Sequence, residues 1–169
     1  MRDKIIVTIR GATLQDIPAI TAIYNEAILK TTATFDTERK TESDQVKWFH
    51  AHGEKNPVLV ALLGEEITGW ASLNPYSDRL GYSDTAEVSL YIAEKFRGKG
   101  VGRALLEKLL QVGKERGLYT ALARITEGNQ LSIDLHRDFG FVHVGVLREL
   151  GVKFGKRIDV HVLQLIFKN

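Results

Sequence analysis

The chain has 169 residues, enough for a single domain with a substantial hydrophobic core. Its 23 Lys and Arg against 21 Asp and Glu leave a net charge of +2, a near balance that argues against nucleic acid as the main partner. Cysteine is absent, which excludes a disulfide framework, a thiolate metal site and a cysteine nucleophile.

The first residues indicate a strand rather than a targeting segment. Residues 1–4 lead into a β-branched run at 5–10, which lacks the character of the apolar core of a secretory signal. No apolar stretch approaches the length of a membrane span. We therefore expect a cytoplasmic enzyme or binding domain.

A first helix is predicted after that strand. Thr13 or Asp16 can cap it, and Pro18 falls in its first turn. The helix carries apolar side chains at helical spacing, at Ile17, Ile20, Ile23, Tyr24, Ala27 and Ile28.

An ordered loop and a second helix follow. Residues 31–38 are β-branched and polar, and Phe35 is the one large apolar anchor of this stretch. The second helix follows a cap at Thr41 or Ser43 and ends before the break at Asn56 and Pro57.

Two strands of a hairpin are predicted next. Residues 58–63 form a buried strand, 64–66 a tight turn and 67–73 the partner strand. Residues 74–84 form a loop rich in turn formers. A solvated loop rarely needs two aromatic side chains, so we interpret this one as functional; it carries Tyr76, Arg79 and Tyr82.

The most informative stretch is a strand, a glycine-rich turn and a helix at residues 86–117. In the strand the apolar residues alternate, so that Glu87, Ser89 and Tyr91 share the opposite face. In the helix the apolar side chains recur at i, i+4, i+8 and i+11. They are Val101, Leu105, Leu109 and Val112.

The turn between strand and helix predicts an anion site. Helix starts leave backbone N–H groups unpaired, and glycines let a ligand approach them closely. Arg97, Lys99 and Arg103 add positive charge. No Ser or Thr follows Lys99 as a P-loop requires, and Arg103 stands where a dinucleotide fingerprint starting at Gly98 needs glycine. A basic turn that merely opens a surface helix remains the alternative.

The remaining chain predicts a strand, a helix and a closing hairpin. Residues 119–125 form the strand, and 129–139 a helix that ends at Gly140. Residues 141–152 and 157–167 form the hairpin across 153–156. The order β-α-α-β-β-β-α-β-α-β-β indicates an α/β (α+β) fold with one mixed sheet and helices on both faces.

Two motifs resemble those of the GNAT superfamily of acyl-CoA N-acyltransferases. Arg97-x-x-Gly100-x-Gly102 matches the pyrophosphate-binding pattern [RQ]-x-x-G-x-[GA]. One strand later, Asn129-x-x-Ser132-x-x-Leu135-His136-x-x-x-Gly140-Phe141 matches N-x-x-[AS]-x-x-[LF]-[YH]-x-x-x-G-F. The two motifs stand in the order and spacing of that superfamily, and the resemblance spans nearly the whole chain.

Further positions look like the phosphinothricin and methionine-sulfoximine N-acetyltransferases. The matches are Ala86-Glu87, Arg79-x-x-Tyr82, His136 where many relatives carry Tyr, Phe35-x-Thr37-Glu38 and Gly151-x-Lys153-x-Gly155-x-x-x-Asp159. One departure is Ser77, where some relatives carry a lysine that could contact a substrate oxyanion.

The resemblance implies a single GNAT domain over residues 1–169, with a mostly antiparallel sheet splayed at the central strand. It implies acetyl transfer from acetyl-CoA to the primary amine of a small amino-acid analogue, with no metal, and a homodimer. The coenzyme would contact Leu90, Tyr91, Ile92, Arg97, Gly98, Lys99, Gly100, Val101, Gly102, Arg103, Asn129 and Ser132. The oxyanion would be held by backbone N–H near Leu90 or Tyr91.

Two side chains are candidates for proton transfer. Glu87 is the first, as the base that removes the amine proton; an ion-paired or solvated strand carboxylate is the alternative. His136 is the second, as base or as proton donor to the leaving thiolate. A helical histidine that only satisfies a local hydrogen bond is its alternative.

The acceptor would be held by three side chains. Arg79 could pair with a carboxylate in bidentate geometry, while Tyr82 and Phe35 would wall the pocket. A solvated loop charge is the alternative for Arg79. Other functions left open are acetylation of a protein N-terminus or a polyamine, although Arg79 would repel a polyamine, and a CoA-binding module without catalysis.

Overall fold

The computed structural model describes residues 6–168. Its strands are β1 (Val7–Gly11), β2 (Val58–Leu63), β3 (Glu66–Pro75), β4 (Thr85–Ile92), β5 (Thr120–Thr126), β6 (Val142–Lys153) and β7 (Lys156–Ile166). Its α-helices are α1 (Ile17–Lys30), α2 (Glu42–His50), α3 (Val101–Glu115) and α4 (Gln130–Asp138), with short 3-10 turns at Leu14–Asp16, Leu80–Tyr82 and Glu94–Phe96. The order of strands and helices is the predicted one.

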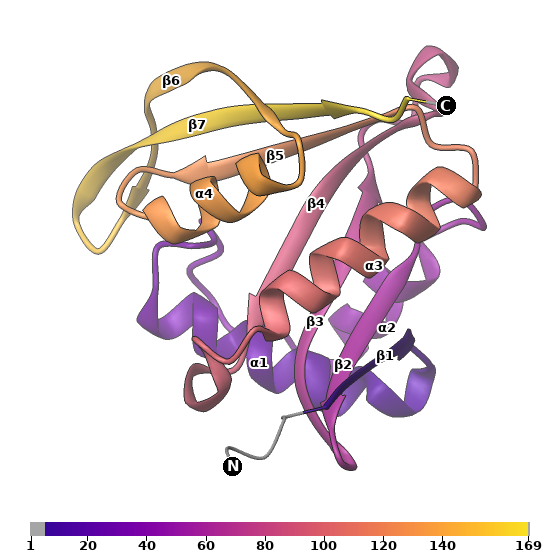
Figure 1. Cartoon of the computed structure of the whole chain (residues 1–169). Coiled ribbons are helices and arrows are strands. Elements are labelled where there is room, and N and C mark those ends of the chain that lie inside the picture. Colours follow the sequence, from indigo (N-terminus) through magenta and orange to yellow (C-terminus); the bar gives the residue numbers. More distant parts are fainter. Residues whose placement is uncertain (1–5, 169) are drawn as a thin grey trace, which may run out of the picture.

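The seven strands form one sheet in the order β1-β2-β3-β4-β5-β7-β6. Neighbouring strands are antiparallel except β4 and β5, which the helix α3 connects as a crossover. The prediction of a mixed, mostly antiparallel sheet is therefore confirmed. Figure 1 shows α3 and α4 over one face, with α1 and α2 over the other.

Each face of the sheet has its own apolar cluster. On the α3 side Leu105 and Leu109 are fully buried, as the helical spacing predicts, and Leu106 joins them. Fully burying a leucine side chain stabilises the fold by about 1.5–3 kcal/mol. On the α1 side Ile20 packs with Trp70 of β3 in the smaller cluster.

The helix starts are capped much as predicted. Thr13 precedes the 3-10 turn, and its N–H donates to Asp16 Oδ2 at 2.8 Å, just before α1 begins. Arg10 also pairs with Asp16, and this guanidinium holds the pKa of the Asp16 carboxyl below its usual value. Thr41 caps α2 by accepting from the Asp44 N–H at 3.0 Å, whereas Ser43, the other candidate, lies inside the helix.

Some element ends differ from prediction. Strand β3 continues past residue 73 because Asn74 and Pro75 still pair with the start of β4. The closing hairpin turns on two residues, Phe154 (φ 50°) and Gly155 (φ 73°), because the Lys153–Lys156 pair is still part of the ladder. Of the first predicted strand, Ile5 lies outside the described residues, as do residues 1–4.

The central feature of the sheet is the divergence of β4 and β5. Their parallel pairing covers only Thr85–Glu87 against Thr120–Leu122, after which the strands separate (Figure 1). On its other edge β4 stays paired with β3 as far as Ile92. The backbone of β4 from Val88 onward therefore has no ladder partner on its β5 side among residues 6–168.

Candidate active site

The glycine turn forms an open helix N-terminus. Gly98 and Gly100 have φ of 74° and 83°, in the left-handed region that favours glycine, and Gly100 is the N-cap of α3. The first helical bond runs from Ala104 N to Gly100 O at 3.1 Å. Within residues 6–168, the three preceding amides, 101–103, have no backbone partner, so they are available to an anionic group.

A cavity of about 540 Å³, here called the glycine-turn cavity, opens onto this turn. It is lined by most of the predicted coenzyme-binding residues, namely Leu90, Tyr91, Ile92, Arg97, Gly98, Gly100, Val101, Gly102, Asn129 and Ser132. Arg97 is tied back to the strand by donating from Nε to Ile92 O at 3.1 Å. The glycine-turn cavity is thus formed where β4 ends and α3 begins.

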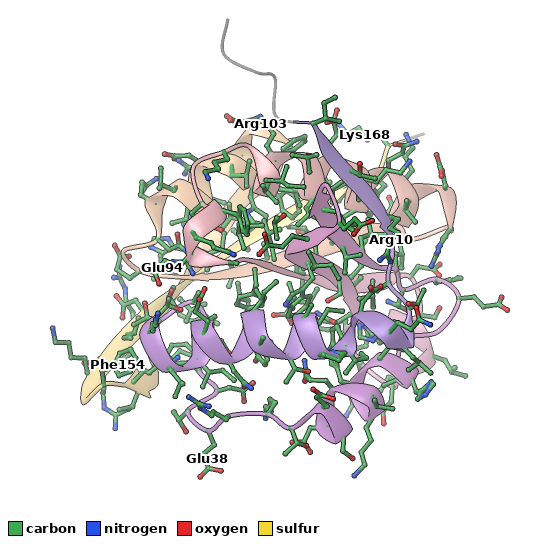
Figure 2. The ribbon with its side chains drawn as sticks, turned by 90° about the horizontal axis from the view of Figure 1, so that it is seen from below. Arg10, Glu38, Glu94, Arg103, Phe154 and Lys168 are labelled. Carbon is green, nitrogen blue, oxygen red and sulfur yellow. The ribbon has the colours of Figure 1, made fainter. Side chains whose placement is uncertain are left out.

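Two predicted coenzyme contacts lie outside that lining. Lys99 Nζ is 5.4 Å from the ring centroid of Phe96. Arg103 pairs with Asp138 of α4 at 2.6 Å, and Figure 2 shows Arg103 on the opposite side of the sheet from α1. The positive charge that directly lines the glycine-turn cavity therefore comes from Arg97.

The gap between β4 and β5 contains a small cavity of about 60 Å³, here called the splay cavity. Two buried polar atoms of residues that line it, Thr126 Oγ1 and His136 Nε2, have no hydrogen-bond partner in the part of the chain that the structure describes. Buried polar groups are nearly always paired, so this cavity suits a water or a substrate group.

The imidazole of His136 is held in one orientation. It is 3 % exposed, packs edge-on against Phe141, and its Nδ1 lies 2.7 Å from Ser132 O. A carbonyl only accepts, so Nδ1 carries the proton and Nε2 presents a lone pair. Burial lowers the His136 pKa, with the Ser132 bond opposing this shift, so the ring is neutral near pH 7.

Asn129 and Ser132 line both the glycine-turn cavity and the splay cavity. Asn129 occupies the N-cap position of α4, but its side chain makes no capping hydrogen bond. Its amide is therefore not committed to the helix that it precedes. Both side chains lie where a chain passing from one cavity to the other would meet them.

A third hollow of about 420 Å³, here called the Glu87 cavity, lies beyond the splay. Glu87 accepts two hydrogen bonds there from Arg124 of β5, at 2.7 Å from Nε and 2.8 Å from Nη2. The carboxylate is thus ion-paired while still lining the cavity, and this pairing raises the Arg124 pKa. Phe35 and Leu150 provide apolar walls.

The predicted acceptor residues Arg79 and Tyr82 lie in the exposed loop before β4. They do not contribute to the lining of the glycine-turn, splay or Glu87 cavities. Tyr82 packs edge-on against Tyr76 with ring centroids 5.1 Å apart. Phe35 is the predicted acceptor contact that does line the Glu87 cavity.

The loop that carries Phe35 is fastened to the β6–β7 hairpin. The buried Lys153 donates from Nζ to Thr34 O at 2.7 Å. Tyr24 of α1 donates to Asp36, the next residue but one after Thr34. Phe35 is therefore held from both sides, by a helix and by a hairpin.

A fourth hollow of about 330 Å³, here called the Trp70 cavity, adjoins the Glu87 cavity and shares Asp36, Ser89 and Tyr91 with it. Its aromatic walls include Trp48 and Trp70. The Trp70 indole N–H is buried and lacks an acceptor among the described residues.

The three cavities along the splay form a series. Ala33 and Tyr91 line the glycine-turn, splay and Glu87 cavities alike. A ligand whose anionic end binds the free amides at α3 could thus extend through the gap toward Glu87.

Comparisons with known proteins agree with this geometry. The profile of the acetyltransferase (GNAT) family matches residues 20–141. The chain belongs to the GNAT acetyltransferase family. It is an acetyl-CoA-dependent N-acetyltransferase, and the predictions of fold and enzyme class are confirmed.

Individual GNAT relatives match most of this chain. The L-methionine sulfoximine/L-methionine sulfone acetyltransferase of Pseudomonas paraeruginosa is 37% identical over 160 residues, 94% of this chain and 93% of the relative. A GNAT phosphinothricin acetyltransferase of Sinorhizobium meliloti, solved in complex with AcCoA, has a TM-score of 0.91 at 31% identity, covering 95% of this chain and 88% of that one. The ribosomal-protein-alanine N-acetyltransferase of Brucella melitensis has a TM-score of 0.91 at 37% identity, covering 95% and 99%.

Acetyl-CoA fits the observed GNAT site. Its diphosphate suits the three free amides and Arg97, and the open strand edge after Val88 offers backbone groups to its amide arm. Residues 6–168 contain no group of three or more His, Asp or Glu side chains arranged to hold a metal ion. Over the same residues, no helix is long and apolar enough to cross a membrane.

Sequence reasoning missed Arg124, Thr126 and Leu150. Arg124 lies in the strand predicted at 119–125, on the face that Glu87 occupies on its own strand, whereas Thr126 lies one residue beyond that predicted strand and inside the observed β5. Side chains at every second residue of neighbouring parallel strands point to the same face of the sheet. This rule was the signal that could have predicted an Arg124–Glu87 contact. Leu150 offered no comparable signal, because its place depends on how the hairpin folds back.

Proposed function

We propose that this enzyme transfers acetyl from acetyl-CoA to the primary α-amine of a small amino-acid-like acceptor, such as phosphinothricin or methionine sulfoximine. The observation that carries this proposal is the row of cavities through the splay, which leads from the glycine turn to the carboxylate of Glu87 in its ion pair with Arg124. The names of the Pseudomonas and Sinorhizobium relatives support the choice of acceptor.

The reaction would be a direct attack in a ternary complex. The amine nitrogen forms a bond to the thioester carbonyl carbon, and the carbon–sulfur bond then breaks. An enzyme without cysteine has no thiol to carry the acetyl group, which favours the single displacement. The backbone N–H of Leu90 or Tyr91, on the β4 edge that β5 leaves open, would stabilise the oxyanion.

Two protons must leave an ammonium acceptor, and two residues are suited to take them. Glu87 would receive the first and pass it to solvent, which generates the neutral amine. His136 would receive the second at Nε2 as the carbon–nitrogen bond forms, then return it to the leaving sulfur. The neutral resting state of His136 supports this order, since Nε2 starts as an acceptor.

Acetyl-CoA would be bound mainly by residues that line the glycine-turn cavity. The amides of residues 101–103 and Arg97 would bind the diphosphate, with Lys99 and Arg103 contributing charge from farther away. Backbone groups of 90–92 and the side chains of Asn129 and Ser132 would meet the pantetheine arm. Arg79 and Tyr82 would form the outer rim of the acceptor site, with Phe35 inside it.

Release of the CoA thiol tests this proposal directly. We expect thiol release on adding methionine sulfoximine or phosphinothricin, with saturation in both substrates. Saturable binding of acetyl-CoA in calorimetry, without turnover for a broad panel of amino-acid analogues, would contradict it.

A protein N-terminus is the second candidate acceptor, because the Brucella neighbour is named as a ribosomal-protein-alanine N-acetyltransferase. A short peptide that begins with alanine provides the comparison. A higher kcat/KM for this peptide than for all free amino-acid analogues would favour the second function.

We also propose that two copies of the chain associate through β6. This edge strand exposes a row of apolar side chains, Val142, Val144, Leu147, Leu150 and Val152, and Phe154 in the turn that follows it is exposed as well. Figure 2 shows Phe154 projecting from the tip of the hairpin. Sedimentation should give a dimer at micromolar concentration, and a monomer would refute the association.

A further inference from the structure

We propose that Arg124 binds the carboxylate of the acceptor, so that Glu87 and Arg124 together select an α-amino acid by its amine and its carboxylate. This inference rests on the proposed function and specifies the substrate class. It gives the ion pair at the splay a role in specificity beyond joining two strands.

The geometry of the pair leaves one side of the guanidinium open. A guanidinium offers two edges that can each donate a pair of parallel hydrogen bonds to a carboxylate. Glu87 occupies the edge made by Nε and Nη2, at 2.7 and 2.8 Å. The edge made by Nη1 and the second N–H of Nη2 donates to no other side chain or backbone group within residues 6–168.

The location of Arg124 fits a substrate contact. Arg124 lines both the splay cavity and the Glu87 cavity, and its side chain is 51 % exposed. It is the one cationic side chain among the described residues that line the Glu87 cavity. Arg124 is therefore the residue in this lining that can pair with an anion.

The other charged residues of the Glu87 cavity also suit a zwitterionic acceptor. Glu87 and Asp36 are the acidic residues of its lining, and Asp36 is engaged by Tyr24 and by Lys40 at 3.3 Å. The paired Glu87 and Arg124 thus present adjacent negative and positive groups. An α-amino acid carries the complementary charges one carbon apart, whereas a simple amine or a polyamine would leave the open guanidinium edge unused.

A comparison of two acceptors tests this role. Wild type, Arg124→Gln and Arg124→Lys should each be assayed with methionine sulfone and with its α-carboxamide, which keeps the amine but lacks the carboxylate. We expect wild type to favour the free acid by about 10- to 100-fold in kcat/KM, as a charge-assisted bidentate contact implies. In Arg124→Gln this preference should fall to within about threefold, while Arg124→Lys retains part of it.

A purely structural role predicts another result. If Arg124 only orients Glu87, Arg124→Gln will lower kcat/KM for both acceptors by the same factor, and our inference is wrong. Arg10→Gln is the matched control, because Arg10 forms a two-bond pair with Asp16 far from the splay. It should leave the ratio between the acceptors unchanged.

The two proposals can fail separately. A wild-type enzyme that acetylates methionine sulfone but accepts the carboxamide equally well overturns the role of Arg124 and leaves the proposed function intact. A wild-type enzyme that binds acetyl-CoA in calorimetry but acetylates neither of these compounds nor any other amino-acid analogue of a broad panel overturns the proposed function together with the role of Arg124.

Discussion

Phe35 lies directly over the backbone of Gly151. A Cβ built on Gly151 would come within 2.5 Å of the Phe35 ring, and the ring is one wall of the Glu87 cavity. The backbone of the hairpin therefore limits where the Phe35 wall of the proposed acceptor site can lie.

Gly151→Ala should displace Phe35 and weaken acceptor binding. We expect KM for the acceptor to rise about tenfold, while KM for acetyl-CoA stays within twofold, because the glycine-turn cavity is untouched. Gly145→Ala on the same strand is the control, since a Cβ there meets nothing within 4 Å. Equal effects of the two variants would show that Phe35 is not a wall of the acceptor site.

Gly100→Ala should weaken coenzyme binding. The residue has φ of +83°, so alanine costs about 1–2 kcal/mol of strain and adds a methyl group at the amide cluster. Gly117→Ala is matched to it, with φ of +87° beyond the other end of α3. Calorimetry should show at least a tenfold weaker affinity for acetyl-CoA in Gly100→Ala alone. Similar affinities in both variants would remove the glycine turn from the coenzyme site.

Glu87→Gln should lower kcat by about 10²- to 10³-fold, the range expected for loss of a general base. Glutamine keeps one acceptor oxygen for Arg124 but cannot take a proton. Affinity for acetyl-CoA measured by calorimetry should not change, because Glu87 does not line the glycine-turn cavity. A change in kcat below threefold would assign Glu87 to the ion pair alone.

The pH dependence of activity should report on His136. Because burial lowers its pKa below the usual 6.5, the imidazole is the unprotonated acceptor at pH 7 and above. We expect kcat to fall only as pH drops below 6.5, with this acidic limb absent in His136→Gln. An acidic limb of unchanged position in the variant would assign it to another group.

The pH dependence of folding stability should also report on His136. In the unfolded chain His136 has a pKa of about 6.5, and in the folded protein its pKa is lower. As pH falls, the unfolded chain therefore takes up the proton first, and the folded state loses stability from pH 6.5 down through the folded pKa. Between pH 7 and 8 it contributes no pH dependence. Wild-type Tm should therefore fall more steeply below pH 6.5 than that of His136→Gln, and parallel curves would contradict the lowered pKa.

Local patterns predicted most of the fold. Alternation in residues 86–92 and helical spacing after residue 101 identified the strand–turn–helix unit without reference to other parts of the chain. The need for glycine at Gly100 likewise follows from its left-handed φ, which is a local property. The sequence could not predict which of Thr41 and Ser43 is the N-cap of α2, because both side chains can cap a helix.

The site was harder to predict because its contacts depend on tertiary structure. Arg103 follows the glycine turn in sequence, yet the docking of α4 brings Asp138 to it and draws it away from the glycine-turn cavity. The partner of Glu87 lies 37 positions away and depends on where two strands part. Arg79 and Tyr82 carry the expected side chains, but the loop that holds them lies outside the lining of the glycine-turn, splay and Glu87 cavities.

Tyr91 lines the glycine-turn, splay, Glu87 and Trp70 cavities. A single residue, through its backbone and its side chain together, thus borders cavities with different proposed ligands. Attempts to retarget this enzyme by mutating Tyr91 would disturb every compartment at once. Engineering of acceptor choice should begin instead at Phe35 and Leu150, which border one compartment alone.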